Sequence, residues 1–415
     1  MLVIGRPIRG DRMLEETKEL NSSKSVNKLA LVATFGILSA FAPFSTDMYL
    51  SSFPSIADSL NTSIANVQYS LSTYFIGLAF GQLLYAPIIE RYGRKVPMLM
   101  GILLFALVSF MIMFSSNIET FVGFRLLQAI GGCAGMIVSR VIIQDLFSQR
   151  ESASALSLMM MIQGIGPIAA PLLGAYIHKI WGWEAVFLFL AILGLLCFLV
   201  SIKTVPETLK EPVEINVKNI ITPFYELFKR REFVIPLLSG SIALSTMFIF
   251  ISGSPFVFMS IYGLSQEHYS WLFGCFALGM VFSGQFNNKM MKKHSPYRVY
   301  KSTLVFLLVM SLIVVLLGQT TNMWLFILPL FFCIATVPII GANSTAMAMS
   351  VSGKFAGSAS SIVGVVQFGF ASLTSALVSG LSNGTSYPMT IGIAVVSLLA
   401  IGLMFLYKPT SDSDS

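Results

Sequence analysis

Residues 203–231 read KTVPETLKEPVEINVKNIITPFYELFKRR, a polar stretch of mixed charge that contains three prolines. It interrupts a chain of 415 residues of which 55% are hydrophobic and only 11% are charged. A soluble chain carries about 25% charged residues, which keep its surface hydrated. The mean hydropathy of +0.80 therefore indicates a protein that crosses a membrane many times, and this linker divides it into two parts.

Apolar stretches long enough to cross a bilayer recur on both sides of the linker. A helix of about 20 apolar residues spans the hydrocarbon layer and satisfies its backbone hydrogen bonds internally. We therefore expect an all-α membrane protein with twelve transmembrane helices, six on each side of the linker. The expected spans are 29–52, 67–89, 96–115, 120–143, 153–177, 185–202, 233–252, 268–288, 301–318, 323–347, 357–380 and 387–407. The apolar run continues over 253–264, so the seventh helix is expected to extend further.

The basic residues fall almost entirely on one side of this arrangement. With the amino terminus in the cytoplasm, all 26 Lys and Arg residues are cytoplasmic except Lys179, on the opposite side, and Arg125 and Arg140, inside the fourth span. Cytoplasmic loops of membrane proteins carry this excess of Lys and Arg. The net charge of +7 therefore indicates orientation, with both termini in the cytoplasm, and argues against a nucleic-acid surface.

The linker and the spans define the expected organisation. An internal repeat supports two halves, because GLAFGQ at 77–82 resembles GMVFSGQ at 279–285. Secondary transporters built from two such halves bind substrate near the midplane between them. The expected parts are a cytoplasmic tail over 1–28, an N-terminal six-helix half over 29–203, a cytoplasmic linker over 204–231, a C-terminal six-helix half over 232–407 and a tail over 408–415.

The amino-terminal region has some features of a signal peptide. A basic tail precedes an apolar run, and Ala40-Phe41-Ala42 loosely fits a cleavage site. The apolar run continues past this point, however, and Pro43 stands where cleavage would fall. We therefore expect the first helix to be retained, with Met1 or Met13 as the start of the chain.

Three ionisable residues lie within the expected spans: Asp47, Arg125 and Arg140. A charge near the bilayer centre costs about 2.5–3.5 kcal/mol, so such residues are usually paired or functional. We interpret Asp47 as a protonatable carboxylate in a central cavity; the alternative is a helix-end residue in water. Arg125 shares a helix face with Gln128; the alternative is an arginine that extends to the membrane surface.

Two interactions of these charges are expected. A buried contact between Asp47 and Arg125, direct or through water, would loosen when the acid is protonated. Arg140 and Asp145, near the cytoplasmic end of the same helix, are expected to form structural ion pairs.

The segment ERYGRK at 90–95 joins two spans with almost no slack. Gly93 permits a tight turn, and Glu90 and Arg94 are placed to clamp neighbouring helix ends. A loop that only sets orientation would explain the basic residues but not the spacing of Gly and acid.

The fifth span contains an unusual concentration of helix-weakening residues. Generic helix packing is one explanation, because close neighbours compensate for backbone hydrogen bonds that such residues lose. The residues are Gly164, Gly166, Pro167, Pro171 and Gly174.

Other functional classes find no support in the sequence. The four cysteines are scattered through apolar runs and the three histidines lie far apart, so neither a disulfide framework nor a metal site is indicated. Nucleophile motifs, phosphate loops and a nucleotide-binding domain are absent from the sequence. We therefore expect a transporter that needs no cofactor and does not use ATP.

Taken in order, these motifs resemble the major facilitator superfamily and, within it, the Bcr/CflA drug:proton antiporters, over residues 30–405. STDMYL at 45–50 is similar to that group's helix 1 signature, and Gly81 to Lys95 to its motif between helices 2 and 3. Arg125 to Gln128 with Gly131 and Gly132 matches the helix 4 motif, and 164–174 the helix 5 antiporter motif. Further similar segments are 205–209, 253–258 and 364–368.

The resemblance implies roles for several residues. Asp47 and Arg125 would couple protons to substrate, and a conformational latch would comprise Gly81, Glu90, Gly93, Arg94, Lys95 and Asp145. Glu90 replaces the family's usual Asp, which puts the latch geometry in doubt; Ala86, Glu184 and Ala342 also depart from the pattern. Aromatic and methionine side chains are expected to line the cavity. The residues expected to bind substrate are Tyr49, Tyr74, Gln128, Phe256 and Gln367.

The function expected from these features is proton-driven export of small, partly apolar organic molecules across a bacterial inner membrane by a monomer. The alternative is a proton-coupled exporter dedicated to one endogenous metabolite, such as a siderophore or an amino-acid derivative. Uptake by symport is disfavoured by the antiporter-like segment 164–174. The multidrug exporter and the dedicated exporter are distinguished by substrate breadth, because only the former should confer resistance to chemically unrelated compounds.

Overall fold

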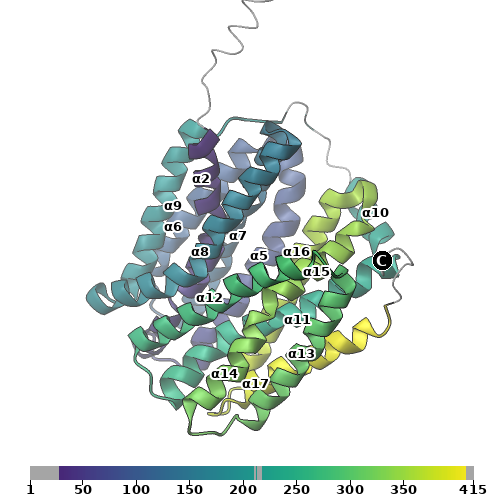
Figure 1. The fold of residues 1–415 in the computed structure, drawn as a ribbon. Helices are drawn as coiled ribbons and strands as arrows, with labels where there is room; N and C mark the ends of the chain where they lie inside the picture. The colour runs from purple at the N-terminus through teal and green to yellow at the C-terminus, as the bar shows by residue number, and fades with distance from the viewer. Residues whose placement is uncertain (1–27, 210–211, 213–216, 408–415) are drawn as a thin grey trace, which may run out of the picture.

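The computed structural model describes residues 28–209, 212 and 217–407, and all the secondary-structure elements within these residues are helices. The expected tails, apart from Lys28, lie outside the described residues, as does the choice between Met1 and Met13. Figure 1 shows two groups of helices: one runs from purple to teal and the other from teal through green to yellow. The first group precedes the linker in the sequence and the second follows it.

The N-terminal half begins at α2 and ends at α9. Asn117 and Ser63 cap helix N-termini by accepting hydrogen bonds from backbone N–H groups at 2.8 and 3.2 Å, as is typical of such positions. The elements are α2 (Lys28–Ser39), α3 (Phe41–Asp47), η1 (Leu50–Ser52), α4 (Phe53–Ser59), α5 (Ile64–Tyr92), α6 (Lys95–Ile112), α7 (Ile118–Leu146), α8 (Gln149–Trp181) and α9 (Glu184–Thr204).

The C-terminal half follows α10 (Val217–Phe228), a helix within the expected linker. Leu227 of α10 is buried with Phe233 and Ile362, so this part of the linker packs on the C-terminal half (Figure 1). The elements are α11 (Arg231–Pro255), η2 (Phe256–Ile261), α12 (Gln266–Met290), α13 (Pro296–Leu316), α14 (Met323–Ala335), α15 (Val337–Ser350), η3 (Gly353–Phe355), α16 (Ala356–Gly380) and α17 (Tyr387–Met404).

Eleven stretches of described helix are long and apolar enough to cross a membrane. The remaining expected span, 268–288, is α12, which is 25 residues long but carries polar residues at both ends. The seventh helix extends as expected, because α11 continues into the π-helical turn η2. The fold therefore agrees with the expected all-α membrane architecture.

Two expected helices are broken in the structure. The first, expected as one helix over 29–52, is divided into α2, α3, η1 and α4 and extends to Ser59. The tenth, expected over 323–347, breaks at Thr336 between α14 and α15. Pro43 lies within α3 and Pro338 at the start of α15, and proline cannot donate a backbone hydrogen bond. These breaks allow backbone carbonyls to bind side chains instead of the next turn.

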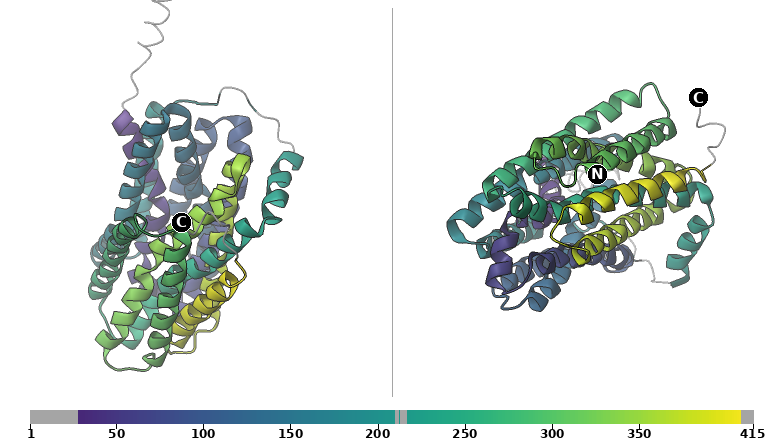
Figure 2. Two further views of the ribbon diagram at one scale, coloured as in Figure 1. Left: turned by 45° about the vertical axis from the view of Figure 1, so that its right-hand side comes forward. Right: turned by 90° about the horizontal axis from the view of Figure 1, so that it is seen from below.

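The halves meet along two seams, α5 with α16 and α8 with α12. Figure 2 shows the two groups side by side from the side and from below. We call the end of the bundle that holds residues 90–95 and the linker the linker end, and the opposite end the far end. Along the first seam, Tyr69 closely approaches Gly380 toward the far end, and Gln82 approaches Gly364 toward the linker end.

Gly174 allows α8 to cross the broken first helix at very short range. A Cβ at residue 174 would overlap the backbone carbonyl of Met48, whereas a Cβ at Gly164 would meet nothing within 4 Å. Because the obstacle is backbone, it cannot move aside as a side chain does. Gly174 therefore permits a backbone crossing beside Asp47.

We expect Gly174→Ala to lower the free energy of unfolding by about 1–3 kcal/mol through overpacking. Gly164→Ala is the matched control and should be neutral or up to about 1 kcal/mol stabilising, since alanine favours helix. Thermal unfolding of both purified variants measures this. Equal effects of the two substitutions would contradict the proposed crossing.

Candidate functional site

Arg125 is fully buried in the N-terminal half and lies between two tyrosine rings. Its guanidinium carbon is 4.4 Å from the ring centroid of Tyr49 and 4.3 Å from that of Tyr74. Its Nη2 donates to the backbone carbonyl of Ser45 at 2.8 Å, and its Nη1 donates to Gln128. Buried cation–π contacts of this kind contribute about 2 kcal/mol each. Through these contacts Arg125, in α7, is joined to α3 at Ser45, to the segment after α3 at Tyr49 and to α5 at Tyr74.

The helix break after α3 makes this arrangement possible. Because α3 ends at Asp47, the carbonyl of Ser45 lies in a last helical turn, whose carbonyls have no intrahelical partner. Arg125 contacts the chain two residues before Asp47, at Ser45, and two residues after it, at Tyr49. The backbone around Asp47 is therefore held from both sides.

Asp47 is 2% exposed and accepts a hydrogen bond from the hydroxyl of Thr46 at 2.8 Å. Asp47 and Arg125 form no ion pair with each other, although both side chains are described. The direct contact considered from the sequence is thus absent here, and a coupling between the two residues stays a prediction.

A cavity of about 340 Å³ lies between the two halves beside Asp47. Among the described residues that line it, Asp47 is the only one with an ionisable side chain. Three phenylalanines and three methionines form much of the wall, as expected from the sequence. The lining is Ala42, Pro43, Thr46, Asp47, Phe75, Leu78, Met136, Met160, Gln163, Gly164, Pro167, Met247, Phe248, Ile251 and Phe368.

The wall of this cavity changes from buried to exposed along the bundle. Thr46 and Asp47 are buried, whereas Met160, which lies nearer the start of α8 at the linker end, is 58% exposed. Phe75 and Phe248, from opposite halves, meet with ring centroids 4.8 Å apart. The carboxylate therefore lies at the enclosed part of the cavity, next to the contact between the halves.

Polar contacts join the halves at the far end. Lys179 of α8 forms an ion pair with Glu267 of α12. Beside it, Gln266 donates to the hydroxyl of Ser55 at 3.4 Å, and Ser55 is 3.2 Å from the ring of His178. These contacts hold the far ends of the two halves together.

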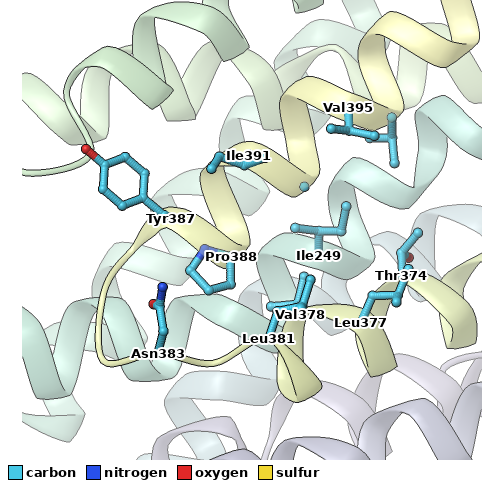
Figure 3. Close-up of a pocket in the computed structure, with 12 residues that line it drawn as sticks. Ile249, Thr374, Leu377, Val378, Leu381, Asn383, Tyr387, Pro388, Ile391 and Val395 are labelled. Carbon is cyan, nitrogen blue, oxygen red and sulfur yellow. The ribbon is translucent and has the colours of Figure 1, made fainter.

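A second hollow, of about 350 Å³, lies in the C-terminal half between α11, α16 and α17 (Figure 3). Ile249 and Val378 contribute to an almost entirely aliphatic lining, with Asn383 and Tyr387 toward one edge. None of its described lining residues is charged. The central cavity is therefore the better candidate for the functional site.

A cluster of charges occupies the linker end of the N-terminal half. Arg94 forms ion pairs of 3.3 Å with Glu90 and with Asp145, and donates to the carbonyl of Ile89 at 2.6 Å. The hydroxyl of Thr208 also donates to Asp145, at 2.6 Å. The sequence thus identified residues that do lie together, and all of them belong to one half.

Glu207, which was not among the predicted latch residues, organises this cluster. Its carboxylate accepts the backbone N–H groups of Arg94 and Lys95 at 2.8 and 3.0 Å. Burial opposes ionisation of Glu207, but backbone donors at Arg94, Leu209, Lys95 and Thr208 outweigh it and hold the pKa below its ordinary value. Gly93 has φ +90°, and a Cβ there would collide with the same carboxylate.

Other predicted residues lie outside these sites. Gly81 packs against Cys133, where an added Cβ would come within 2.6 Å, and it lies on α5 before the charge cluster begins at Ile89 and Glu90. Of the helix 5 motif, Gly164 and Pro167 line the cavity, while Gly166 packs on Pro43 and Pro171 is buried.

The expected substrate residues are placed away from the cavity lining. Tyr49, Tyr74 and Gln128 surround Arg125. Phe256 lies in η2, and Gln367 is half-buried next to Phe368. Their roles in substrate binding stay predictions.

The expected pairing of Arg140 with an acid is wrong. Asp145 pairs with Arg94 instead, and none of the described acids lies within ion-pair distance of Arg140. The two residues are five apart on α7, a spacing that does not place side chains on one helix face.

Sequence reasoning missed most of the cavity wall, including Phe75, Phe248 and Gln163. A signal was present, because Gln163 lies one turn before Pro167, and Met247 one turn before Ile251. Residues four apart share a helix face, so the kinked face of the fifth helix could have been extended to Gln163.

Comparison with known proteins agrees with this architecture. The sequence pattern of the Major Facilitator Superfamily matches residues 35–376. The chain is 30% identical over 390 residues to a bicyclomycin resistance protein homolog of Haemophilus influenzae, covering 92% of this chain and 97% of that protein. It is 27% identical over 402 residues to a chloramphenicol resistance protein of Pseudomonas aeruginosa, covering 92% of each.

A solved structure shares the fold. The crystal structure of a D-xylose-proton symporter superposes with a TM-score of 0.76 at 14% identity, covering 94% of this chain and all of that one. The chain belongs to the Major Facilitator Superfamily. It is a multi-pass membrane transporter of small molecules rather than an enzyme, and it is related to drug-resistance efflux proteins.

We expect Glu207→Gln to destabilise the protein, because an amide accepts the backbone N–H groups less strongly than a carboxylate. Since the pKa of Glu207 is lowered on folding, its stabilisation is complete above the ordinary value of 4.5. It is lost as the pH falls through the lower folded-state pKa. The melting temperature of the native protein should exceed that of the variant near neutral pH and converge with it in acid.

Glu226→Gln is the matched control, because Glu226 of α10 lies outside the charge cluster and makes only a 3.8 Å pair with Lys229. Its melting curve should follow that of the native protein at each pH. A Glu207→Gln variant with an unchanged melting temperature at neutral pH would show that the carboxylate does not organise the cluster.

Proposed function

We propose that the protein is a proton-coupled exporter of small amphipathic compounds in a bacterial inner membrane, of the Bcr/CflA multidrug type. The observation that carries this proposal is the position of Asp47, a buried carboxylate in the wall of the cavity between the halves. Keeping a carboxylate charged in such a place without a cation is costly. A proton or a polar group of a substrate therefore offsets its charge.

The proposed orientation places the linker end in the cytoplasm. Arg91, Arg94 and Lys95 lie at that end, whereas Lys179 lies at the far end. This distribution follows the tendency of cytoplasmic loops to carry Lys and Arg. The exposed part of the cavity wall near Met160 then faces the side from which an exporter takes its substrate.

The coupling cycle follows from this placement. Substrate binding from the cytoplasmic side favours release of the proton from Asp47. The transporter then reorients and releases the substrate on the opposite side of the membrane. A proton from that side neutralises Asp47, and the cavity opens again to the cytoplasm. A membrane potential supplies about 2.3 kcal/mol for each charge moved across 100 mV, and this energy drives export.

The chemistry of the wall supports small, partly aromatic substrates. Phe75, Phe248 and Phe368 provide ring faces, and Met136, Met160 and Met247 provide flexible apolar contacts. Methionine surfaces adapt to varied ligands. Two of the related proteins are named for resistance to chloramphenicol and bicyclomycin, which makes chloramphenicol a suitable test compound.

We expect Asp47→Asn to abolish chloramphenicol-induced proton release from energised inverted vesicles, because the amide cannot release a proton. Asp58→Asn is the matched control, since Asp58 is exposed on α4, and it should release protons as the native protein does. Only in Asp47→Asn should proton release fall to the background level, which is measured with vesicles that lack the transporter. Undiminished release would rule out Asp47 as the coupling acid.

The same assay separates a broad from a dedicated exporter. Proton release with several chemically unrelated compounds supports the multidrug function. If none of the compounds in a broad panel causes proton release, an exporter dedicated to one metabolite is favoured.

A further inference from the structure

Arg140 is a cation inside a membrane-spanning helix for which none of the described residues is a partner. It lies in α7 (Ile118–Leu146), six residues before the helix ends. Its Nε is buried and has no hydrogen-bond partner. The Nε of Arg125, in the same helix, also lacks a partner, but its Nη atoms donate to a carbonyl and an amide and its guanidinium lies between two rings.

Arg140 is not among the residues that line the cavity, but the helical register places it one turn from the cavity wall. Met136, one turn earlier on α7, lines the cavity. Cys133, two turns earlier, packs against Gly81 of α5. Residues at i, i+4 and i+7 share a helix face, so Arg140 lies between the direction of the cavity and that of α5. It is one turn nearer the linker end than Met136.

A half-buried cation inside a membrane-spanning helix calls for an explanation. Ionisable residues within membrane helices usually face the bundle interior or a water-filled cavity and mark a site. Six further residues, about 9 Å of helix, separate Arg140 from the end of α7. Its guanidinium has five N–H donors in a fixed fork, which suits carboxylate, sulfonate and similar oxygen groups.

We infer that Arg140 binds an anionic or strongly electronegative oxygen group of the transported molecule at the linker end of the cavity. Asp47, at the enclosed end, takes a hydrogen-bond donor of the same molecule, and the aromatic wall takes its apolar body. The substrates are thus molecules with an acceptor and a donor on either side of an apolar centre. This inference rests on the proposed function only in taking the central cavity as the transport site.

Two fluorescent dyes test the inference. Anilinonaphthalene sulfonate and phenylnaphthylamine share the same rings and N–H donor and differ in the sulfonate. Saturable binding of each dye is measured with the purified full chain in phosphatidylcholine nanodiscs, with empty nanodiscs subtracted. Arg140→Gln should weaken binding of the sulfonate by about tenfold or more, as expected for loss of a charged hydrogen bond, and leave the neutral dye within about twofold.

Arg91→Gln is the matched control, because it removes an exposed arginine from the linker end and should change neither dye. Arg140→Lys should retain much of the sulfonate binding. The native protein gives a second readout that needs no variant. Modification of Arg140 by phenylglyoxal, followed by mass spectrometry, should be slowed by the sulfonate and not by the neutral dye.

Several results would overturn the inference. These are native protein without saturable sulfonate binding, equal loss of both dyes in Arg140→Gln, and no protection of Arg140 by the sulfonate. If Arg140 instead holds a lipid phosphate, Arg140→Gln will reduce retention of phosphatidylglycerol and leave both dyes unaffected. Failure of proton-coupled transport would not alter these binding measurements, so the two proposals fail separately.

Discussion

The enclosure of Arg125 by Tyr49, Tyr74 and the carbonyl of Ser45 determines the geometry of the central site. A guanidinium cannot lose its proton in a protein, so this charge must be solvated wherever it is buried. The break in the first helix supplies the carbonyl, and two rings supply the remaining contacts. Arg125 contacts the chain at Ser45 and at Tyr49, on both sides of Asp47. The contacts that stabilise the buried arginine therefore also fix the position of the carboxylate.

The distribution of strong interactions suits a transporter whose halves move as bodies. The ion pairs and hydrogen bonds around Arg94 and Glu207 lie within the N-terminal half and the first residues of the linker. Between the halves lie aromatic contacts such as Phe75 with Phe248 and the exposed pair of Lys179 and Glu267. Exposed ion pairs contribute only about 0–1 kcal/mol, so the far end can open without breaking a buried ion pair.

Much of the architecture could be predicted from the sequence, because a bilayer restricts what an apolar segment can do. The spans, the division near residue 203 and the grouping of Glu90, Arg94 and Asp145 follow from hydropathy and spacing. The breaks at Pro43 and Pro338 depend on tertiary contacts that replace lost hydrogen bonds. The meeting of Phe75 with Phe248 depends on how each helix is rotated, and neither residue carries a local signal.

The two membrane arginines illustrate the same limit. Arg125 was expected to contact Asp47, but its partners are two rings, a carbonyl and the amide of Gln128. Arg140 was assigned to an ion pair because an acid lay nearby in the sequence, yet that acid is held by Arg94. Charge neutralisation in a folded protein depends on distance in space, and five residues along a helix place two side chains on different faces.

The central claim is that Asp47 exchanges its proton for substrate. Isothermal titration of purified protein with chloramphenicol, in two buffers of different ionisation enthalpy near neutral pH, counts the protons released at equilibrium without a membrane gradient. The account predicts proton release from the native protein and none from Asp47→Asn. Substrate binding by the native protein without proton release, or equal release from the variant, would contradict it.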